Sequence, residues 1–213
     1  MKNSFKNVFY WFMGLIFCDL GVSLCTKSDL GLSMIGASPY ILHVYMRDRF
    51  AWFSQGTAEY VWEAIVLVVA CIILRRFKFR YLLSFVTAVL AGFCIDGWLF
   101  VLGGNAPYET LAGRITAFVL GTVVCAFGIA FYFHTTMPMQ VYELAVYEIA
   151  DRYKLNRNKV KYVNDAVLLV VAIVLSFLLT HKFTGIGIGT IIITIVNAPL
   201  IAFFDKLIFR KGN

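Results

Sequence analysis

Six long apolar stretches constrain this chain more than any other feature of its sequence. A helix needs about 20 mostly apolar residues to cross the hydrocarbon core of a bilayer. Stretches of about that length lie at residues 8–25, 57–74, 82–102, 113–133, 163–180 and 187–209. Of the 213 residues, 61% are hydrophobic and 15% are charged, whereas a soluble domain has roughly 45–50% and 25%. The sequence therefore predicts an all-α membrane protein with six transmembrane helices in a single polytopic domain, residues 1–213.

The distribution of Lys and Arg residues predicts the orientation of these spans. Cells keep the Lys and Arg residues of short loops preferentially on the cytoplasmic side. If the N-terminus is inside, the outer segments hold only five of the 19 Lys and Arg residues: Lys27, Arg47, Arg49, Arg114 and Lys182. We therefore expect both termini in the cytoplasm. This topology also accounts for the net charge of +7, so we expect no nucleic-acid partner.

The fifth span repeats a pattern found in the second. Residues 60–74 read YVWEAIVLVVACIIL, and residues 162–179 read YVNDAVLLVVAIVLSFLL. A shift of 102 residues brings a Tyr-x-x-acid-Ala lead and an apolar run into register, with Glu63 opposite Asp165. The match indicates an internal repeat.

Glycines in the first and fourth spans support the same repeat. A shift of 107 residues places Gly14 opposite Gly121 and Gly21 opposite Gly128. Small residues seven apart share one face of a helix and let a neighbouring helix approach closely. These faces predict tight helix packing within the chain, and they are also compatible with a homodimer.

A proline-bearing segment follows each of these glycine-containing spans. The first segment contains Pro39 and the second contains Pro138, and each proline precedes a short amphipathic run. Such a run is either a helix that lies on the membrane surface or a re-entrant helix that lines a cavity, since irregular backbone at membrane depth needs protein or water around it. Both interpretations remain open at this point.

Each half of the chain thus contains three spans and one proline-bearing short helix. Because three is odd, the second half crosses the membrane in the opposite direction to the first. We expect residues 8–102 to superpose on residues 113–209 about an axis in the membrane plane. Inverted repeats of this kind are typical of secondary transporters, whose sites lie where the repeats meet.

Four polar residues inside or beside the spans are candidates for binding a substrate or an ion. Asp19 and Asp96 lie within the first and third spans, and they are joined by Glu143 and by Asn197 of the last span. A charge at the bilayer centre costs at least about 2.5 kcal/mol, so such residues normally face the protein interior and mark an ion or substrate path. Asp19 and Asp96 are either a cation- or proton-binding pair in a shared cavity or separately hydrogen-bonded packing residues.

The repeat-related acids, Glu63 and Asp165, have a simpler explanation. Both come early in their spans, where the positive end of the helix dipole favours an acid. For Asp165, the basic loop that ends at Lys159 and Lys161 gives a further structural reason.

Three prolines and a histidine are candidates for helix breaks or gates. Pro39, Pro138 and Pro199 each remove a backbone donor, and we expect the last to interrupt its helix. His134 lies near the cytoplasmic end of the fourth span. It is either an inner gate with Glu143 or an interfacial anchor.

No pattern in the sequence indicates enzymatic chemistry. The five cysteines form no Cys-x-x-Cys pair and have no histidine at ligand spacing, so we expect neither a metal site nor disulfides. There is no glycine-rich phosphate loop, no nucleophile elbow and no His-Glu-x-x-His motif. We therefore expect a protein that is not an enzyme and that holds no cofactor.

Three stretches carry a resemblance to a known family: DLGVSLCTKSDLGLSMIGASPYIL, MPMQVYELAVYEIADRYKLNRNKVKYVNDAVLLVVAIVL and GIGIGTIIITIVNAPLIAFF. They resemble the YczE/YitT-like bacterial integral membrane proteins, especially the YczE branch, over essentially the whole chain. The chain departs from the family pattern where Ile41 and Gln140 replace an aspartate and Ala198 replaces a glycine. The resemblance implies a small six-span protein of the bacterial inner (plasma) membrane, with transport as its expected activity.

Two functions of different kinds follow from these observations. The first is a transporter of a small molecule or ion, coupled to protons or cations, with its site between two inverted repeats. The alternative is a membrane-embedded substrate-binding or regulatory subunit that acts with a partner protein. In either case the expected partners are membrane lipid and an unidentified small-molecule or ion substrate.

Overall fold

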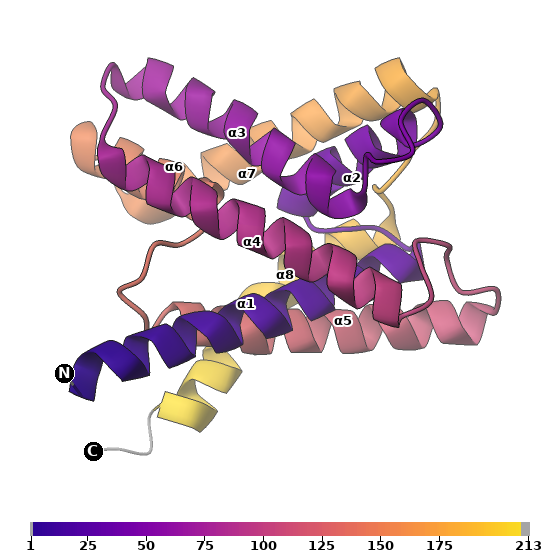
Figure 1. Ribbon diagram of the computed structural model, residues 1–213, viewed down its shortest axis with the longest axis horizontal. Coiled ribbons are helices and arrows are strands. Elements are labelled where there is room, and N and C mark those ends of the chain that lie inside the picture. Colours follow the sequence, from indigo (N-terminus) through magenta and orange to yellow (C-terminus); the bar gives the residue numbers. More distant parts are fainter. Residues whose placement is uncertain (1, 210–213) are drawn as a thin grey trace. The chain divides into compact units, whose positions relative to one another are not determined.

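The computed structural model describes residues 2–209, and these residues form helices joined by loops, with no strand among them (Figure 1). The helices are α1 (Lys2–Ser28), α2 (Met34–Met46), α3 (Gln55–Leu74), α4 (Phe79–Val101), α5 (Leu111–Tyr132), α6 (Val141–Arg152), α7 (Arg157–Leu175), the short π-helix η1 (Ser176–Thr180) and α8 (Ile188–Phe209). Six helical segments are long and apolar enough to cross a membrane. They lie where the sequence predicts them, so the prediction of six spans is confirmed.

The two remaining helices, α2 and α6, have 13 and 12 residues. At a rise of 1.5 Å per residue they are too short to cross a bilayer. They are the two short helices predicted from the proline-bearing segments, with one difference. Pro138 precedes α6 as expected, whereas Pro39 lies inside α2.

The predicted interruption at Pro199 is absent. Helix α8 runs without a break from Ile188 to Phe209 and contains Pro199 in its interior. A proline removes only one hydrogen bond of the ladder, and membrane helices tolerate this loss when neighbouring turns hold the backbone.

The described residues divide into two compact units, and each contains segments from both halves of the chain. Unit 1 consists of the described parts of Met1–Ser33, Cys94–Met137 and Gly185–Asn213. It holds α1, the end of α4, α5 and α8. Unit 2 consists of Met34–Phe93 and Pro138–Thr184. It holds α2, α3, the first part of α4, α6, α7 and η1.

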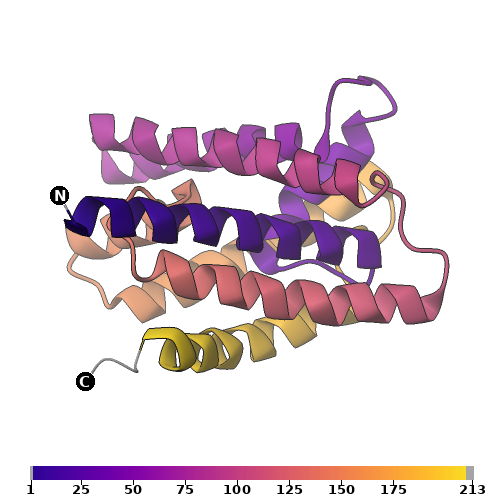
Figure 2. The same ribbon diagram turned by 60° about the horizontal axis from the view of Figure 1, so that its bottom comes forward.

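In unit 1, α1 and α5 lie side by side (Figure 2). A Cβ atom added to Gly21 would lie 2.5 Å from the Cβ atom of Cys125, and one added to Gly128 would overlap the backbone of Cys18. Cys18 precedes Gly21 in α1, whereas its partner Gly128 follows Cys125 in α5. The two helices are therefore antiparallel. The glycine faces therefore permit close packing, as the sequence predicts.

These contacts are reciprocal. A shift of 107 residues converts Gly21 into Gly128 and Cys18 into Cys125, so the two glycine contacts exchange with each other. The Sγ atoms of Cys18 and Cys125, which are equivalent positions, lie 3.8 Å apart. The helix pair consequently has a local two-fold axis that passes near these cysteines, perpendicular to both helices.

Backbone contacts in unit 1 bring the start of α8 next to the segment that follows α1. The Leu32 N–H group donates to the Gly185 carbonyl at 2.9 Å, and the Gly189 N–H group donates to the Leu30 carbonyl at 2.9 Å. A Cβ atom at Gly187 would lie 2.5 Å from the Leu30 carbonyl oxygen. Gly187 and Gly189 thus permit a close approach of the segment that follows α1 to the start of α8.

Unit 2 is built around α3 and α7, which each contact both short helices. Helix α2 packs against α3 and α7, and α6 packs against the same two helices. Trp62, Tyr142 and Leu168 form a buried cluster at the centre of these contacts, with Ile35 packed against it. The side chains thus come from α2, α3, α6 and α7.

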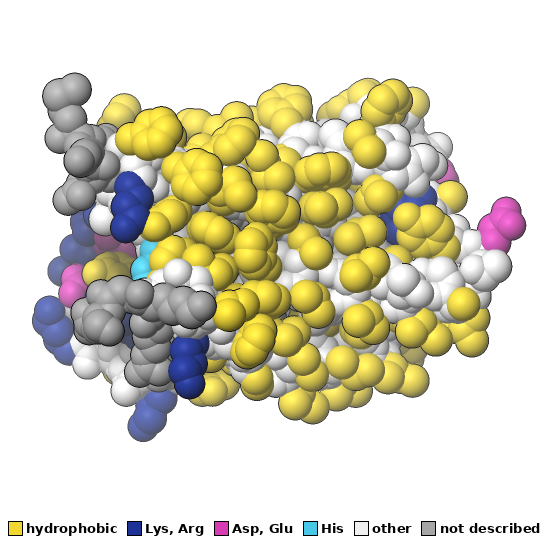
Figure 3. All heavy atoms as spheres, turned by 90° about the horizontal axis from the view of Figure 1, so that it is seen from below, with side chains coloured by type: hydrophobic (Ala, Val, Ile, Leu, Met, Phe, Trp, Pro, Cys, Tyr) yellow, Lys and Arg dark blue, Asp and Glu magenta, His cyan; other side chains and the backbone are white. Residues whose placement is uncertain are grey.

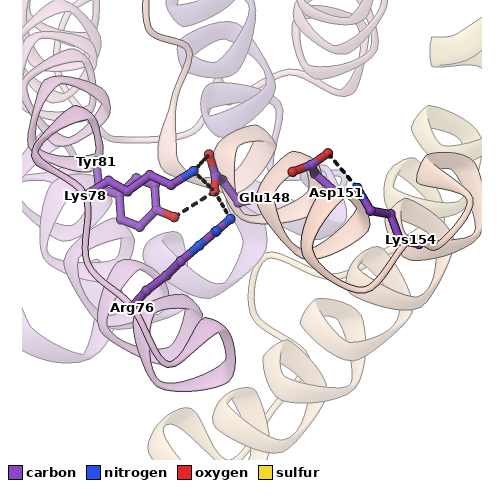
Figure 4. A network of polar contacts seen from close by, with 6 residues as sticks. All are labelled: Arg76, Lys78, Tyr81, Glu148, Asp151 and Lys154. Atoms are coloured by element: carbon purple, nitrogen blue, oxygen red, sulfur yellow. Dashed lines mark hydrogen bonds and ion pairs between the residues drawn. The ribbon is translucent and has the colours of Figure 1, made fainter.

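An ionic network attaches α6 to the connection between α3 and α4 (Figure 4). Oε2 of Glu148 accepts hydrogen bonds from Arg76 at 2.8 Å, Lys78 at 2.7 Å and Tyr81 at 2.8 Å. Burial alone would raise the pKa of Glu148, but the hydrogen bonds from Lys78, Tyr81 and Arg76 outweigh it and hold the pKa below its ordinary value. The carboxylate therefore remains charged, and it joins α6 to the α3–α4 connection.

The outer surface of α8 is strongly apolar. Its exposed residues include Ile188, Ile191, Ile195, Phe203 and Leu207. Figure 3 shows a face that is covered largely by hydrophobic side chains, while Lys and Arg side chains gather toward one end. Such a surface suits contact with lipid tails.

We predict that Gly21→Ala lowers the apparent melting temperature in detergent, by an amount equivalent to roughly 1–3 kcal/mol, because the new Cβ atom would overlap Cys125. Gly97→Ala is the matched control, since an added Cβ atom at that position meets nothing within 4 Å. Fluorescence-detected size-exclusion chromatography after heating measures both. Equal stability of the two variants would contradict the packing of α1 on α5.

We predict that Glu148→Gln lowers stability by about 1.5–3 kcal/mol near neutral pH, because charge-assisted hydrogen bonds are lost. Since the pKa of Glu148 lies below its ordinary value of 4.5 in the folded protein, its stabilisation is complete above that value and is lost as the pH falls through the folded-state pKa. The difference between wild type and variant should therefore shrink below about pH 4.5.

The control for this prediction is Asp151→Asn, which changes an exposed acid of the same helix that lies 3.9 Å from Lys154. Melting curves over a pH series measure all three proteins. A difference that stays constant down to the lowest pH would show that the charge of Glu148 is not what stabilises α6.

Candidate functional site

Helix α3 carries a column of buried polar side chains. Gln55, Glu59 and Glu63 are four residues apart and therefore lie on one face of the helix. They are 1%, 5% and 0% exposed, and the neighbouring Trp62 is 9% exposed. Two acids so deeply buried in one membrane span are rare and costly, which makes this column the strongest candidate site in unit 2.

The carboxyl group of Glu63 holds the start of α6. The Val141 N–H group donates to Oε2 of Glu63 at 2.7 Å, and Gln140, which precedes α6, makes no side-chain cap. The free N–H groups and the positive dipole at a helix N-terminus favour a carboxylate there. Glu63 lies more than two turns into α3, so the expected role at the start of its own helix is wrong: it serves the start of a different helix.

Glu59 faces the second residue of α6. The Tyr142 hydroxyl donates to Oε1 of Glu59 at 3.4 Å. Burial raises the pKa of the Tyr142 phenol well above its ordinary value, and the charges of Glu59 and Glu63 act in the same direction. The hydroxyl group therefore stays protonated and remains a donor.

Three buried polar atoms of this column and one of the neighbouring Trp62 have no hydrogen-bond partner among the described residues. They are Oε1 of Gln55, Oε2 of Glu59, Oε1 of Glu63 and Nε1 of Trp62. Glu59 and Glu63 are also close enough to interact electrostatically. Each buried atom left unpaired costs about 1–3 kcal/mol, and more when charged. Two such carboxylates can both stay ionised only if a cation lies beside them. Without a cation, one of them takes up a proton.

The equivalent place in the second half of the chain has a different charge. Asp165 corresponds to Glu63, and Lys161 corresponds to Glu59 under the shift of 102 residues. The Lys161 ammonium lies 2.8 Å from Oε1 of Glu143 and 3.9 Å from Oδ2 of Asp165. The acids of the second half thus share a lysine, as the basic loop suggested for Asp165, whereas neither Glu59 nor Glu63 forms an ion pair with a basic side chain within residues 2–209.

The two intramembrane aspartates both belong to unit 1. Asp19 is 1% exposed, and the Cys94 thiol lies beside its carboxyl group. Asp96 is half-buried, in the last part of α4. Their role as a substrate- or ion-binding pair in a shared cavity stays a prediction.

The expected gate residues have structural contacts of their own. Nε2 of His134 lies 2.5 Å from Oδ1 of Asp205, and the His134 ring stacks on Phe209 with 3.7 Å between centroids. His134 therefore ties the end of α5 to α8. Asn197 is half-buried and Pro199 is exposed within α8, and their proposed roles in binding and gating stay predictions.

Sequence reasoning missed Gln55 and Glu59. The signal that would have found them is their spacing, since they precede Glu63 by eight and four residues and so form one polar stripe along an apolar span.

Among residues 2–209, no group of three or more His, Cys, Asp and Glu side chains is arranged to hold a metal ion.

Comparison with known proteins gives two matches and one negative result. Residues 5–206 match DUF6198, described as a family of unknown function. The chain is also similar to the uncharacterized protein YyaS of Bacillus subtilis (strain 168), with 28% identity over 205 residues that cover 94% of this chain and 93% of that protein. No solved structure matches. The resemblance to YczE/YitT-like proteins is thus not confirmed by name, and the chain belongs to DUF6198.

Proposed function

We propose that this protein is a cation- or proton-coupled membrane transporter with its site in unit 2. One observation carries the proposal: Glu59 and Glu63 are buried in a single membrane span, and each has an unpaired carboxylate oxygen. Intramembrane acids of this kind mark ion, proton or substrate paths. The site lies where α3, from the first half of the chain, meets α6 and α7 from the second.

The proposed architecture is a pair of inverted repeats, and contacts within each unit support it. In unit 1, α1 and α5 form an antiparallel pair with reciprocal contacts. In unit 2, α2 packs on α3 and α7 while α6 packs on α7 and α3, so an exchange of halves leaves the set of neighbours unchanged. Secondary transporters built in this way bind their substrates where the repeats meet.

The acid pair supplies a simple means of coupling. When no cation is bound, a proton shared by Glu59 and Glu63 reduces the cost of burying two charges. An incoming cation replaces that proton, because its positive charge also lowers the cost of burying the carboxylates. The proton and the cation therefore compete for one site, and movement of one drives movement of the other. The N-terminus of α6 keeps Glu63 in place during this exchange through its bond to Val141.

We predict that purified protein in liposomes exchanges protons for cations. Liposomes that contain a pH-sensitive dye are given a panel of organic and inorganic cations, and the luminal pH is followed. Wild type should respond to at least one member of the panel. Glu59→Gln and Glu63→Gln should reduce this response to the level of protein-free liposomes, because they remove the exchangeable charge but preserve side-chain shape.

Asp151→Asn is the control, since it removes an exposed acid of α6 and should leave the flux unchanged. The absence of a response from folded wild-type protein across the whole panel, or full activity of both glutamine variants, would overturn the transporter. A flux that needs a co-purifying protein would instead favour a substrate-binding subunit.

A further inference from the structure

We propose that the acid column of α3 binds an elongated organic dication, of the class of α,ω-diaminoalkanes with about four methylene groups. This inference rests on the proposed function and names the class of substrate for the same site.

Three of the four unpaired atoms are oxygens, and they select a ligand that donates hydrogen bonds, while the fourth, Nε1 of Trp62, is itself a donor. Gln55, Glu59 and Glu63 each present an unpaired oxygen, and these oxygens accept if the carboxyl groups are ionised and the amide is oriented as in the structure. An alkylammonium group has three N–H donors and no acceptor, so it complements such oxygens. A phosphate or carboxylate ligand would meet them with like charge.

The spacing of the column selects the length of the ligand. Residues four apart are separated by about 6 Å along a helix axis. The five single bonds that join the nitrogens of an extended 1,4-diaminobutane are each about 1.5 Å long, which in a staggered chain separates the nitrogens by about 6 Å. One ammonium group can thus pair with Glu59 and the other with Glu63, and the two charges of the ligand balance the two carboxylates.

The surrounding side chains suit an organic cation. Trp62, Tyr142 and Leu168 form the buried cluster beside the acids, and they supply apolar and aromatic surface for methylene groups. Aromatic faces also attract ammonium groups. A small metal ion would need additional oxygen ligands, whereas residues 2–209 contain no group of three or more His, Cys, Asp and Glu side chains placed for a metal.

Lys161 provides an internal example of the interaction. It corresponds to Glu59 in the second half of the chain, and its side chain is a four-carbon alkylammonium. Its ammonium nitrogen lies 2.8 Å from Glu143 and 3.9 Å from Asp165. Unit 2 thus already holds one alkylammonium group, that of Lys161, between two carboxylates. The corresponding residue of the first half is the acid Glu59.

Thermal stability of the purified protein in detergent tests the inference, since a ligand that binds only the folded state raises the apparent melting temperature. The probes are 1,4-diaminobutane, 1,2-diaminoethane and butylamine, at equal ionic strength adjusted with sodium chloride. We expect 1,4-diaminobutane to reach its half-maximal shift at a concentration about tenfold or more below that of butylamine, because a second charge-assisted hydrogen bond is made.

Variants locate the binding. Glu59→Gln and Glu63→Gln should each remove the preference for 1,4-diaminobutane over butylamine, and Asp151→Asn should retain it. If either glutamine variant does not fold, the comparison of 1,4-diaminobutane with 1,2-diaminoethane on wild type still decides, because the shorter diamine cannot reach both acids. Equal shifts from the two diamines, or a preference that survives both glutamine changes, would overturn the inference.

The liposome assay separates this inference from the proposed function. Proton exchange that depends on Glu59 and Glu63 but is driven by other cations, without binding of 1,4-diaminobutane, would reject the diamine and leave the transporter standing. Binding of 1,4-diaminobutane that depends on both acids, without any flux, would support the diamine site and reject the transporter.

Discussion

One hydrogen bond, from the Val141 N–H group to Glu63, determines much of the arrangement of unit 2. A short helix in apolar surroundings must find acceptors for the N–H groups of its first turn. Helix α6 lacks a side-chain cap of its own, and α3 supplies the acceptor. Farther along α6, Glu148 supplies a charge to Arg76 and Lys78. Two carboxylates thus hold α6 beside the candidate site. Glu63 of α3 binds the start of α6, and Glu148 of α6 binds the connection between α3 and α4.

The sequence predicts the features that depend on apolar length and on small residues. The six spans and the close glycine face of α1 follow from hydropathy and spacing, because these signals are repeated over many residues. Pro39 and Pro199 show the limit of local rules, since both lie inside helices that neighbouring turns sustain. A single proline removes one backbone hydrogen bond, and a helix continues through it when the neighbouring turns are held by packing.

The candidate site was only partly predictable for a different reason. The repeat identified Glu63 as a candidate residue. Its partner Val141 is 78 residues away in the sequence, and no local pattern predicts that contact. Gln55 and Glu59 were missed because the mean hydropathy of an apolar span changes little when it contains a few polar residues. Their helical spacing was present in the sequence, yet burial and the lack of partners are properties of the folded chain alone.

The reciprocal contact between α1 and α5 has the geometry of an isologous interface, in which each side presents the same residues to the other. A chain made of one half alone would therefore carry a surface complementary to its own copy. Two such copies would have to enter the membrane in opposite directions. Under the proposed inverted repeat, joining the halves in one polypeptide would remove this requirement and would let each half carry different charges, as Glu59 and Lys161 do at positions 102 residues apart.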